Sequence, residues 1–250
     1  MNQPDTELSI VIPVRDGAEQ LPSTFREIAA YLARTSRPTE VILVDDGSAQ
    51  PAARLLAEFT AATPHVTLLR NDVNRGKGRA VVRGMLAASG RHRIFTDADL
   101  AYPLTEIGTV TAALDAGHDI AIACRVLPES RYVMSPTFFS YLYTRHVLSR
   151  LYNAVVRWTT LPGILDTQAG LKGFTARAAD IVFPRLTIPG FGFDVEALYV
   201  ARRHGLTTRQ VAVSFRYDSE PSAVRLMQDS TTMLTDLIRL RWNSLRGRYR

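Results

Sequence analysis

Two aspartates separated by one residue, Asp97 and Asp99, directly follow an apolar run at residues 93–96. The D-x-D spacing alone predicts little, because a chain with this many aspartates contains such pairs by chance. Their position is more informative, since two carboxylates at the end of a buried strand repel one another unless a cation lies between them. Oxygen ligands of this kind suit Mg²⁺ or Mn²⁺ bridging a diphosphate. A pair of turn aspartates is the plainer alternative.

A second acidic pair, Asp45 and Asp46, ends another apolar run and is followed by a glycine. Asp-Gly after a strand is a common turn, yet adjacent carboxylates can also accept hydrogen bonds from a base imide and from ribose hydroxyls. Residues 74–79 (NRGKGR) are glycine-rich and basic and lead into a predicted helix. Backbone N–H groups and Lys77 suit phosphate contact there, and a plain helix-start loop is the alternative. The spacing fits neither a Walker A loop nor a dinucleotide fingerprint.

Short apolar runs alternate with amphipathic stretches through the first half of the chain. Strands are predicted at residues 8–13, 40–46, 66–69, 93–96 and 119–124, and helices at residues 22–34, 51–62, 78–89 and 105–116. This alternation indicates crossover connections and a mainly parallel central sheet flanked by helices, an α/β fold. Ligands bind beyond the carboxyl ends of such strands, where Arg15-Asp16, Asp45-Asp46 and Asp97–Asp99 all fall. We therefore expect these three clusters to converge on one site.

The second half of the chain has a different pattern. Residues 135–158 predict a long aromatic-rich helix, for which packing in the core and contact with a membrane are both open. A glycine-rich stretch follows at residues 166–173, with helices at residues 176–183 and from Phe193, a strand at 208–217 and an amphipathic helix at 223–245. No low-complexity linker or internal repeat divides the chain, so we expect one domain whose second half builds the other wall of the site.

The composition excludes several protein classes. A chain of 250 residues that is 46% apolar and 22% charged is typical of a soluble globular protein. The single cysteine, Cys124, excludes an intramolecular disulfide and a cysteine-based zinc cluster. No apolar run is long enough to span a membrane, and no secretory signal is expected at the N-terminus. Six arginines against two aspartates in residues 225–250 could serve an anionic membrane surface. Acids at three strand ends would repel a nucleic acid, so no such partner is expected.

Taken together, these motifs resemble family 2 glycosyltransferases. The segments that carry the resemblance, in order, are Ile12–Asp16, Val44–Ser48, Asn74–Gly78, Thr96–Leu100, Arg125, Asp166–Lys172, Phe193–Glu196 and Ser222–Arg239. The set is similar to the polyprenyl- and dolichyl-phosphate glucosyltransferase and mannosyltransferase branch over about residues 8–245. The chain departs from the branch at Arg15-Asp16-Gly17, where relatives usually have Tyr-Asn-Glu, and at Ala101, where mannose-transferring relatives often have Gln.

The resemblance implies a GT-A-like nucleotide-binding sandwich formed by a single glycosyltransferase domain over residues 1–250. The nucleotide-sugar-binding half would be about residues 8–125, and the acceptor-binding half about residues 126–245. The implied activity is the metal-dependent, inverting transfer of a hexose, with glucose favoured, to polyprenyl phosphate. UDP-glucose is the favoured donor and GDP-mannose the other. The protein would be cytoplasmic and peripheral on the cytoplasmic face of a membrane.

The resemblance also assigns roles to residues. The donor would contact Pro13, Arg15, Asp45, Asp46, Lys77, Asp97 and Ala98. Asp97 and Asp99 would hold Mg²⁺ or Mn²⁺, and Gln168 is a further site residue. The acceptor phosphate would contact Arg125, Arg131 and Lys172. The catalytic set would be Asp99, Arg125 and Asp194.

The chemistry of the acceptor decides what Asp194 does. A phosphate monoester, with a second pKa of about 6, is already largely dianionic at neutral pH. Asp194 would then orient the acceptor without taking a proton. A hydroxyl acceptor needs a general base, which Asp194 would supply, and this activity is the alternative. The remaining alternative for the protein is a module that binds a nucleotide sugar without transferring it.

Overall fold

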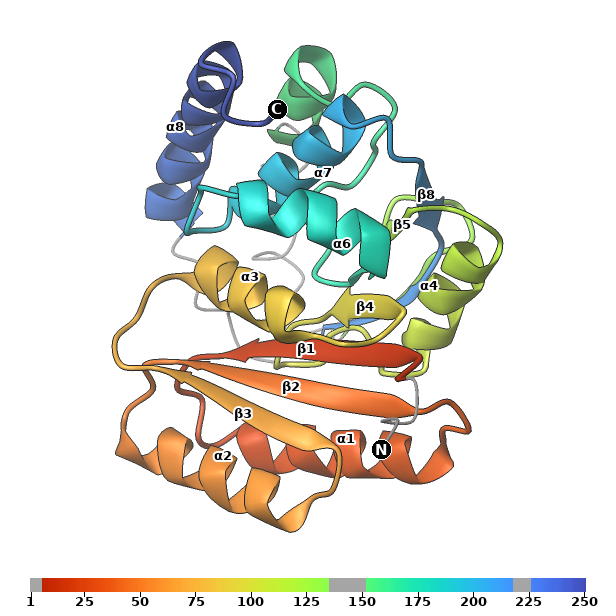
Figure 1. The fold of residues 1–250 in the computed structure, drawn as a ribbon, viewed down its shortest axis with the longest axis vertical. Helices are drawn as coiled ribbons and strands as arrows, with labels where there is room; N and C mark the ends of the chain where they lie inside the picture. The colour runs from red at the N-terminus through yellow and green to blue at the C-terminus, as the bar shows by residue number, and fades with distance from the viewer. Residues whose placement is uncertain (1–5, 135–151, 218–225) are drawn as a thin grey trace.

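The computed structural model describes residues 6–134, 152–217 and 226–250 of the chain. Within them, a seven-stranded sheet has the order β3-β2-β1-β4-β7-β5-β8 (Figure 1). A separate two-stranded ribbon pairs β6 (Arg131–Met134) with β9 (Ser214–Tyr217). The strands of the large sheet are β1 (Leu8–Val14), β2 (Thr39–Asp46), β3 (Val66–Asn71), β4 (His92–Phe95), β5 (Ile120–Ala123), β7 (Lys172–Thr175) and β8 (Thr208–Val211).

The first four strands of the sheet run parallel to one another. β7 lies antiparallel between β4 and β5, and β8 pairs in parallel with β5. The prediction of a mainly parallel central sheet flanked by helices is therefore confirmed. The carboxyl ends of β1, β2 and β3 are level, because Val14 stands opposite Asp45 and Asp46 stands opposite Asn71. Their polar termini thus share one edge of the sheet.

Helices cover both faces of the sheet (Figure 1). One face carries α1 (Leu21–Arg34), α2 (Gln50–Ala62) and α4 (Glu106–Asp115). The other carries α3 (Lys77–Ala87), α6 (Ala176–Val182) with a short 3₁₀ turn (Phe183–Arg185), and α7 (Phe193–Arg203). α8 (Leu226–Leu245) packs outside α7, and residues 152–159 are also helical.

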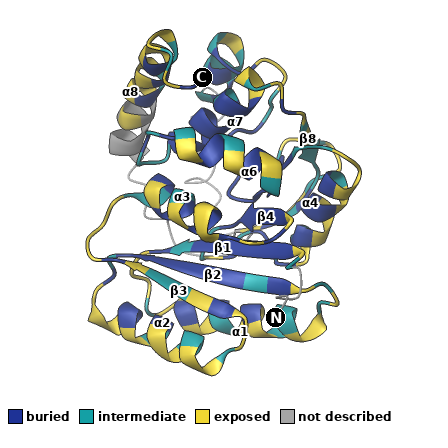
Figure 2. Ribbon diagram, viewed as in Figure 1, coloured by how far each residue is buried: buried dark blue, intermediate teal, exposed yellow. Residues whose placement is uncertain are grey.

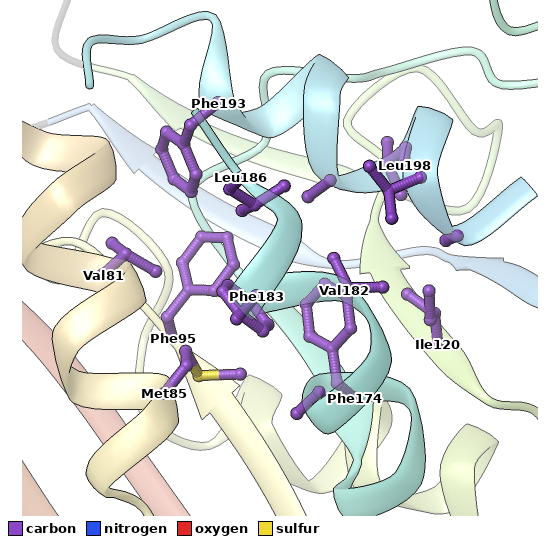
Figure 3. Packing of buried hydrophobic residues seen from close by; sticks show 14 of the residues in the cluster. Val81, Met85, Phe95, Ile120, Phe174, Val182, Phe183, Leu186, Phe193 and Leu198 are labelled. Atoms are coloured by element: carbon purple, nitrogen blue, oxygen red, sulfur yellow. The ribbon is translucent and has the colours of Figure 1, made fainter. Parts of the chain in front are cut away.

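Two hydrophobic cores lie on the two faces because successive side chains of a strand point in opposite directions. In β1, Ile10 and Ile12 join the core beneath α1 and α2, whereas Val11 joins the core beneath α3. Figure 2 shows the central strands buried along their length. In the core beneath α3, the ring centroid of Phe95 lies 6.3 Å from that of Phe174 and 5.6 Å from that of Phe193 (Figure 3). Burial on both sides explains why these strands are continuous apolar runs in the sequence.

Three elements differ from the sequence predictions. β7 was not predicted, because its sequence, KGFT, lies in a glycine-rich stretch and is too short for a period-2 signal. β6 was likewise not predicted. The strand predicted at residues 208–217 is two strands in two sheets: Val211 pairs within the large sheet, while the carbonyl of Val213 accepts from the N–H of Arg131 in the ribbon. Residues 135–151 of the predicted aromatic helix lie outside the described residues.

Candidate functional site

The loops that follow β1 and β2 are joined through Asp16. Its N–H donates to the Ser48 hydroxyl (2.8 Å), and its Oδ1 accepts from the N–H of Ala49 (2.8 Å). Arg15 is exposed, with its Nε 3.8 Å from Asp16 Oδ2, and Pro13 is half-buried in β1. The structure thus brings the Arg15-Asp16 and Asp45-Asp46 clusters together, and the hydrogen bonds of Asp16 connect the two loops.

Asp46, although buried, has both carboxylate oxygens occupied by its own neighbourhood. Oδ1 accepts from Asn71 Nδ2 (2.8 Å) and from the N–H of Arg75 (2.9 Å), and Oδ2 accepts from the N–H of Gly76 (2.8 Å). These bonds hold the glycine-rich loop at residues 74–78 against the end of β2. In this conformation Asp46 organises that loop.

Asp45 differs from Asp46 in having an oxygen without such a partner. Its Oδ1 accepts from the N–H of Ser48 (2.8 Å). Its Oδ2 is buried and has no hydrogen-bond partner among the described residues, and Arg70 Nη1 lies 3.5 Å away. A buried acceptor left unpaired costs about 1–3 kcal/mol. A ligand donor at this position would recover that cost, so Asp45 is the member of the pair that is poised to bind.

Arg70 also lines a hollow of about 300 Å³, together with Arg75, Arg83, Asn71 and Asp72. Arg83 donates to the carbonyl of Arg70 (2.5 Å) and to Asn71 Oδ1 (2.6 Å), which fixes the hollow's wall. Arg70 and Arg83 lie outside the motifs that the sequence predicts for the site. Arg70 could have been identified from its position near the end of a predicted strand, the next one along the chain after the strand that ends at Asp45 and Asp46.

The basic loop is fixed to the segment that precedes α7. The N–H of Gly78 donates to the Pro189 carbonyl (2.7 Å), and Gly76 has a φ of +93°. A side-chain carbon at Gly76 would lie 2.5 Å from that carbonyl oxygen, so only glycine fits. Lys77, between these glycines, places its Nζ 2.6 Å from Asp97 Oδ1. Burial alone would lower the pKa of Lys77, but the charges of Asp97 and Asp194 raise it above its ordinary value.

The loop after β4 carries the predicted metal ligands. Asp97 is half-buried and packs directly on the backbone of Gly170, where no side chain would fit. Asp99 is exposed, and its Oδ1 accepts from the N–H of Ala101 (3.1 Å). The carbonyl of Ala98 accepts from the Thr24 hydroxyl of α1 (2.8 Å), which anchors the loop. In the part of the chain that is described, no group of three or more His, Cys, Asp or Glu side chains could hold a metal ion.

Asp194, in the first turn of α7, forms a buried ion pair with Lys172 of β7. The Lys172 Nζ lies 2.5 Å from Asp194 Oδ1 and also donates to the Ala169 carbonyl (2.5 Å). Asp194 is 3% exposed and Lys172 is fully buried. Burial raises the pKa of Asp194 above its usual value, although the charges of Lys172 and Lys77 oppose that rise. Lys172, predicted to contact the acceptor phosphate, and Asp194, predicted to be catalytic, are thus paired with each other in this structure.

Arg125 is committed to Asp166 in a bidentate pair. Its Nε lies 2.7 Å from Asp166 Oδ2, its Nη2 lies 2.9 Å from Oδ1, and its backbone N–H also donates to Oδ2 (3.1 Å). Burial alone would raise the pKa of Asp166, but the Arg125 guanidinium outweighs it and holds that pKa below its usual range. Asp166, which opens the DTQAG segment, thus anchors Arg125.

Of the three predicted acceptor cations, Arg131 alone is exposed. It lies in β6, whose partner strand β9 contacts the loop after β4 through a hydrogen bond from the N–H of Arg216 to the carbonyl of Ala101 (2.8 Å). Arg216 is exposed too, and it stands opposite Val133, two residues from Arg131. Because side chains alternate along a strand, Arg131 and Arg216 belong to the same face of the ribbon. Arg216 was missed in the sequence analysis.

Two further polar side chains, Gln168 and Asp236, each have a buried atom without a hydrogen-bond partner among the described residues. Gln168 is half-buried, and its Nε2 has no hydrogen-bond partner among the described residues. Asp236 of α8 packs on the backbone of Gly192, two residues before Asp194, and burial raises the pKa of this carboxyl. Asp236 was noted as part of a family segment but not as a site residue. The sequence feature that could have identified Asp236 is its position, because it places a carboxylate on the inward, apolar face of a predicted amphipathic helix.

The fold is shared with a solved transferase. The crystal structure of glucosyl-3-phosphoglycerate synthase from Mycobacterium tuberculosis superposes with a TM-score of 0.68 at 16% identity, covering 94% of this chain and 80% of that chain. A second structure of that enzyme, in complex with Mn²⁺, UDP-glucose and phosphoglyceric acid, has a TM-score of 0.68 at 17% identity and covers 94% and 79%. The predicted GT-A-like fold is confirmed.

Sequence comparison identifies the family. A dolichyl-phosphate beta-glucosyltransferase from Dictyostelium discoideum is 30% identical over 96% of this chain and 75% of its own length. One from Drosophila melanogaster is 34% identical over 85% and 68%, and one from Homo sapiens is 28% identical over 100% and 79%. The family model for glycosyl transferase family 2 matches residues 9–164. The chain belongs to glycosyl transferase family 2.

Proposed function

We propose that the protein transfers a hexose, with glucose favoured, from a nucleotide sugar to polyprenyl phosphate with inversion at the anomeric carbon. The observation that carries this proposal is the pairing of Lys172 with Asp194 beside the Lys77–Asp97 pair, at the carboxyl ends of the parallel strands. The names of the relatives, which are dolichyl-phosphate beta-glucosyltransferases, support the same acceptor class.

The donor would lie across the edge formed by β1, β2 and β4. Asp45 Oδ2, which accepts no hydrogen bond from the described residues, suits an imide or hydroxyl donor of the nucleoside, and the Arg70 guanidinium lies 3.5 Å from it. Lys77 would contact the diphosphate. A UDP-glucose donor agrees with the UDP-glucose complex of the structural neighbour.

Asp97 and Asp99 fit a divalent cation. Mg²⁺ is usually held by one or two carboxylates together with substrate phosphates, and this loop offers one half-buried and one exposed carboxylate. Such a cation, Mg²⁺ or Mn²⁺, supplies Lewis-acid stabilisation of the departing diphosphate. Lys77 occupies Asp97 Oδ1, so we expect its ammonium to exchange that oxygen for the diphosphate when the donor binds.

The acceptor decides the role of Asp194. With a dianionic phosphate the nucleophile is already ionised, and Asp194, held by Lys172, needs only to orient it. The exposed arginines Arg131 and Arg216, on one face of the ribbon, would hold the phosphate. A hydroxyl acceptor is the second candidate, and one observation favours it: burial raises the pKa of Asp194 above its ordinary value, which makes the carboxylate a stronger base.

The lipid acceptor implies contact with a membrane surface, for which we propose a peripheral position on the cytoplasmic face. No helix among the described residues is long and apolar enough to cross a membrane.

The test measures transfer from radiolabelled UDP-glucose to polyprenyl phosphate and, in parallel, to free sugars. We expect labelled polyprenyl product alone. The Asp194→Asn variant should lose only about tenfold in kcat/KM if Asp194 orients the acceptor, and 10²–10⁴-fold if it acts as a base. Glu27→Gln is the matched control, because it also replaces a carboxylate by its amide, at an exposed position of α1. Labelled free-sugar product without polyprenyl product would overturn the proposed acceptor.

A further inference from the structure

The end of α7 that lies away from Asp194 borders a second hollow, of about 410 Å³. Three of its lining residues are arginines, Arg202 and Arg203 of α7 and Arg241 of α8, and two are aromatic, Trp158 and Tyr199. Arg202 is eight residues along α7 from Asp194, which at 1.5 Å per residue is roughly 12 Å along the helix axis. The hollow is therefore separate from the transfer site.

The three arginines of the hollow have no acidic partner among the ion pairs of the described residues. Arg203 donates to the Ser244 hydroxyl (2.8 Å), and Arg202 Nη1 lies 3.4 Å from the Thr160 carbonyl. Burial alone would raise the pKa of Tyr199, yet the Ser244 hydroxyl and the charges of Arg203 and Arg241 lower it. Three like charges around one open hollow favour an anionic ligand.

An exposed apolar stripe runs along α8 next to this hollow. It comprises Leu234, Ile238, Trp242 and Leu245, which are 48%, 71%, 55% and 84% exposed. The spacing of four, four and three residues places them on one side of the helix, opposite the fully buried Leu240. α8 lies at the periphery of the molecule (Figure 2). This helix thus has one apolar side in the core and another in solvent.

Arg241 joins the hollow to the stripe, because it lies three residues after Ile238 and four before Leu245. On the other flank, the Arg246 guanidinium lies 4.5 Å from the ring centroid of Trp242. Trp158, at the hollow, is 90% exposed. Residues 237–250 contain five arginines and no aspartate or glutamate. Apolar, aromatic and cationic side chains therefore share one continuous surface.

We propose that this surface, formed by Trp158, the hollow and the α8 stripe and called here the tryptophan–arginine face, docks on an anionic lipid bilayer, with a headgroup phosphate in the hollow. A helix with exposed leucine, isoleucine and tryptophan between arginines has the pattern of an interfacial helix, and tryptophan favours the headgroup boundary. The phosphates of a nucleic acid would pair with the arginines but would make no contact that explains the exposed aliphatic stripe. The inference rests on the proposed function in one respect: a polyprenyl-phosphate acceptor requires the enzyme to work at a bilayer.

The test is sedimentation of the full chain with vesicles of phosphatidylcholine alone or with 30% phosphatidylglycerol. The vesicles contain no polyprenyl phosphate and no donor is added, so the result is independent of the transfer reaction. We expect binding only to the anionic vesicles. Removing two arginines in the variant Arg202→Gln/Arg241→Gln should weaken binding about 30-fold, at roughly fivefold per charge near an anionic surface.

The matched charge control is Arg26→Gln/Arg209→Gln, which removes two exposed arginines from α1 and β8. It should bind within about twofold of the unmodified chain. Raising NaCl from 0.1 to 0.5 M should shrink the effect of the arginine variant, because salt screens exposed charges. Trp158→Ser should weaken binding at both salt concentrations, since it removes apolar contact, and Leu86→Ser, at a 48% exposed site on α3, is its control.

Equal binding by the unmodified chain and the Arg202→Gln/Arg241→Gln variant overturns the proposal, as does an equal loss in the charge control. Failure of the unmodified chain to bind anionic vesicles also overturns it. Sedimentation without vesicles would then show whether the face instead mediates self-association that the Trp158→Ser variant abolishes. Circular dichroism and thermal unfolding of each variant show that a loss of binding is not a loss of folding.

Discussion

The Lys172–Asp194 pair makes the most direct test of how the site is held together. Lys172 is fully buried, its partner Asp194 is 3% exposed, and the charged atoms are 2.5 Å apart. Removing one partner of such a pair leaves the other charge buried without compensation, which costs about 3–5 kcal/mol. We therefore expect Lys172→Met, which keeps the length and loses the charge, to lower the free energy of unfolding by that amount. For a protein of this size the melting temperature should fall by roughly 6–20 °C.

The assay is a double-mutant cycle of urea and thermal unfolding. The double variant Lys172→Met/Asp194→Asn removes both charges, so it should be more stable than Lys172→Met alone, with a coupling energy of about 2–3 kcal/mol. If the losses of unfolding free energy in the two single variants simply add, the coupling energy is under about 0.5 kcal/mol. That result would refute the assignment of a buried ion pair.

The same pair predicts a dependence on pH. Burial already raises the pKa of Asp194 in the folded chain, and losing Lys172 removes an opposing charge. A carboxyl whose pKa is raised on folding contributes stability at a pH below its unfolded value, and this contribution is lost as the pH rises through the folded value. The deficit of Lys172→Met should accordingly be smaller at pH 5 than at pH 8. A deficit that grows on acidification would contradict this reasoning.

The remaining predictions concern the metal ligands, the basic loop and a buried histidine. Asp99→Asn should lower kcat/KM on the order of 10²–10⁴-fold, and EDTA should abolish transfer, whereas full activity in excess chelator would disprove a metal role for Asp97 and Asp99. Gly76→Ala should cost about 1–3 kcal/mol in urea unfolding, because alanine must adopt a φ of +93° beside the Pro189 carbonyl; an unchanged midpoint would disprove the tight contact. Burial holds the pKa of His92 below its usual 6.5. Just below pH 6.5, the unfolded chain therefore binds a proton at His92 that the folded chain does not bind. Stability should therefore fall as the pH drops through 6.5 towards the folded value, and His92→Asn should reduce that slope in unfolding curves.

The first half of the fold could be predicted from sequence because four of its strands, β1, β2, β4 and β5, are buried along almost their whole length. Such strands are short, continuous apolar runs, and the amphipathic stretches between them are long enough for crossover helices. β7 could not be predicted in this way. It pairs antiparallel between β4 and β5, which come before it in the chain, and its four residues carry a lysine and a glycine. Its place depends on long-range packing, since a side-chain carbon at Gly173 would collide with Val110.

The predicted site residues do lie together at the strand ends, but the contacts of their side chains depend on partners distant in sequence. Asp46 looked equivalent to Asp45, yet its bonds to the loop at residues 74–78 occupy it. The sequence assigns Arg125 to the acceptor phosphate but does not show that Asp166, 41 residues later, forms a bidentate pair with it. Spacing along a chain reports which residue types are available near a site. It does not report which of them neutralise one another.

The use of lysine follows from the geometry of these pairs. The chain has 30 basic residues, and its only two lysines, Lys77 and Lys172, both contact site carboxylates. Arg125 can use its planar fork on both oxygens of Asp166 because it is only partly enclosed. Lys172 is fully enclosed, with the Ala169 carbonyl, Asp194 Oδ1 and the ring of Phe95 around its ammonium.

A guanidinium at position 172 would bring five N–H donors into a space that offers two oxygens, and each buried donor left unpaired costs about 1–3 kcal/mol. Lys172→Arg should therefore destabilise the protein although it keeps the charge, whereas Lys77→Arg, at a side chain that is 22% exposed, should be tolerated in unfolding. Equal melting temperatures for the two variants would show that charge alone, and not the shape of the enclosed cation, is what the site requires.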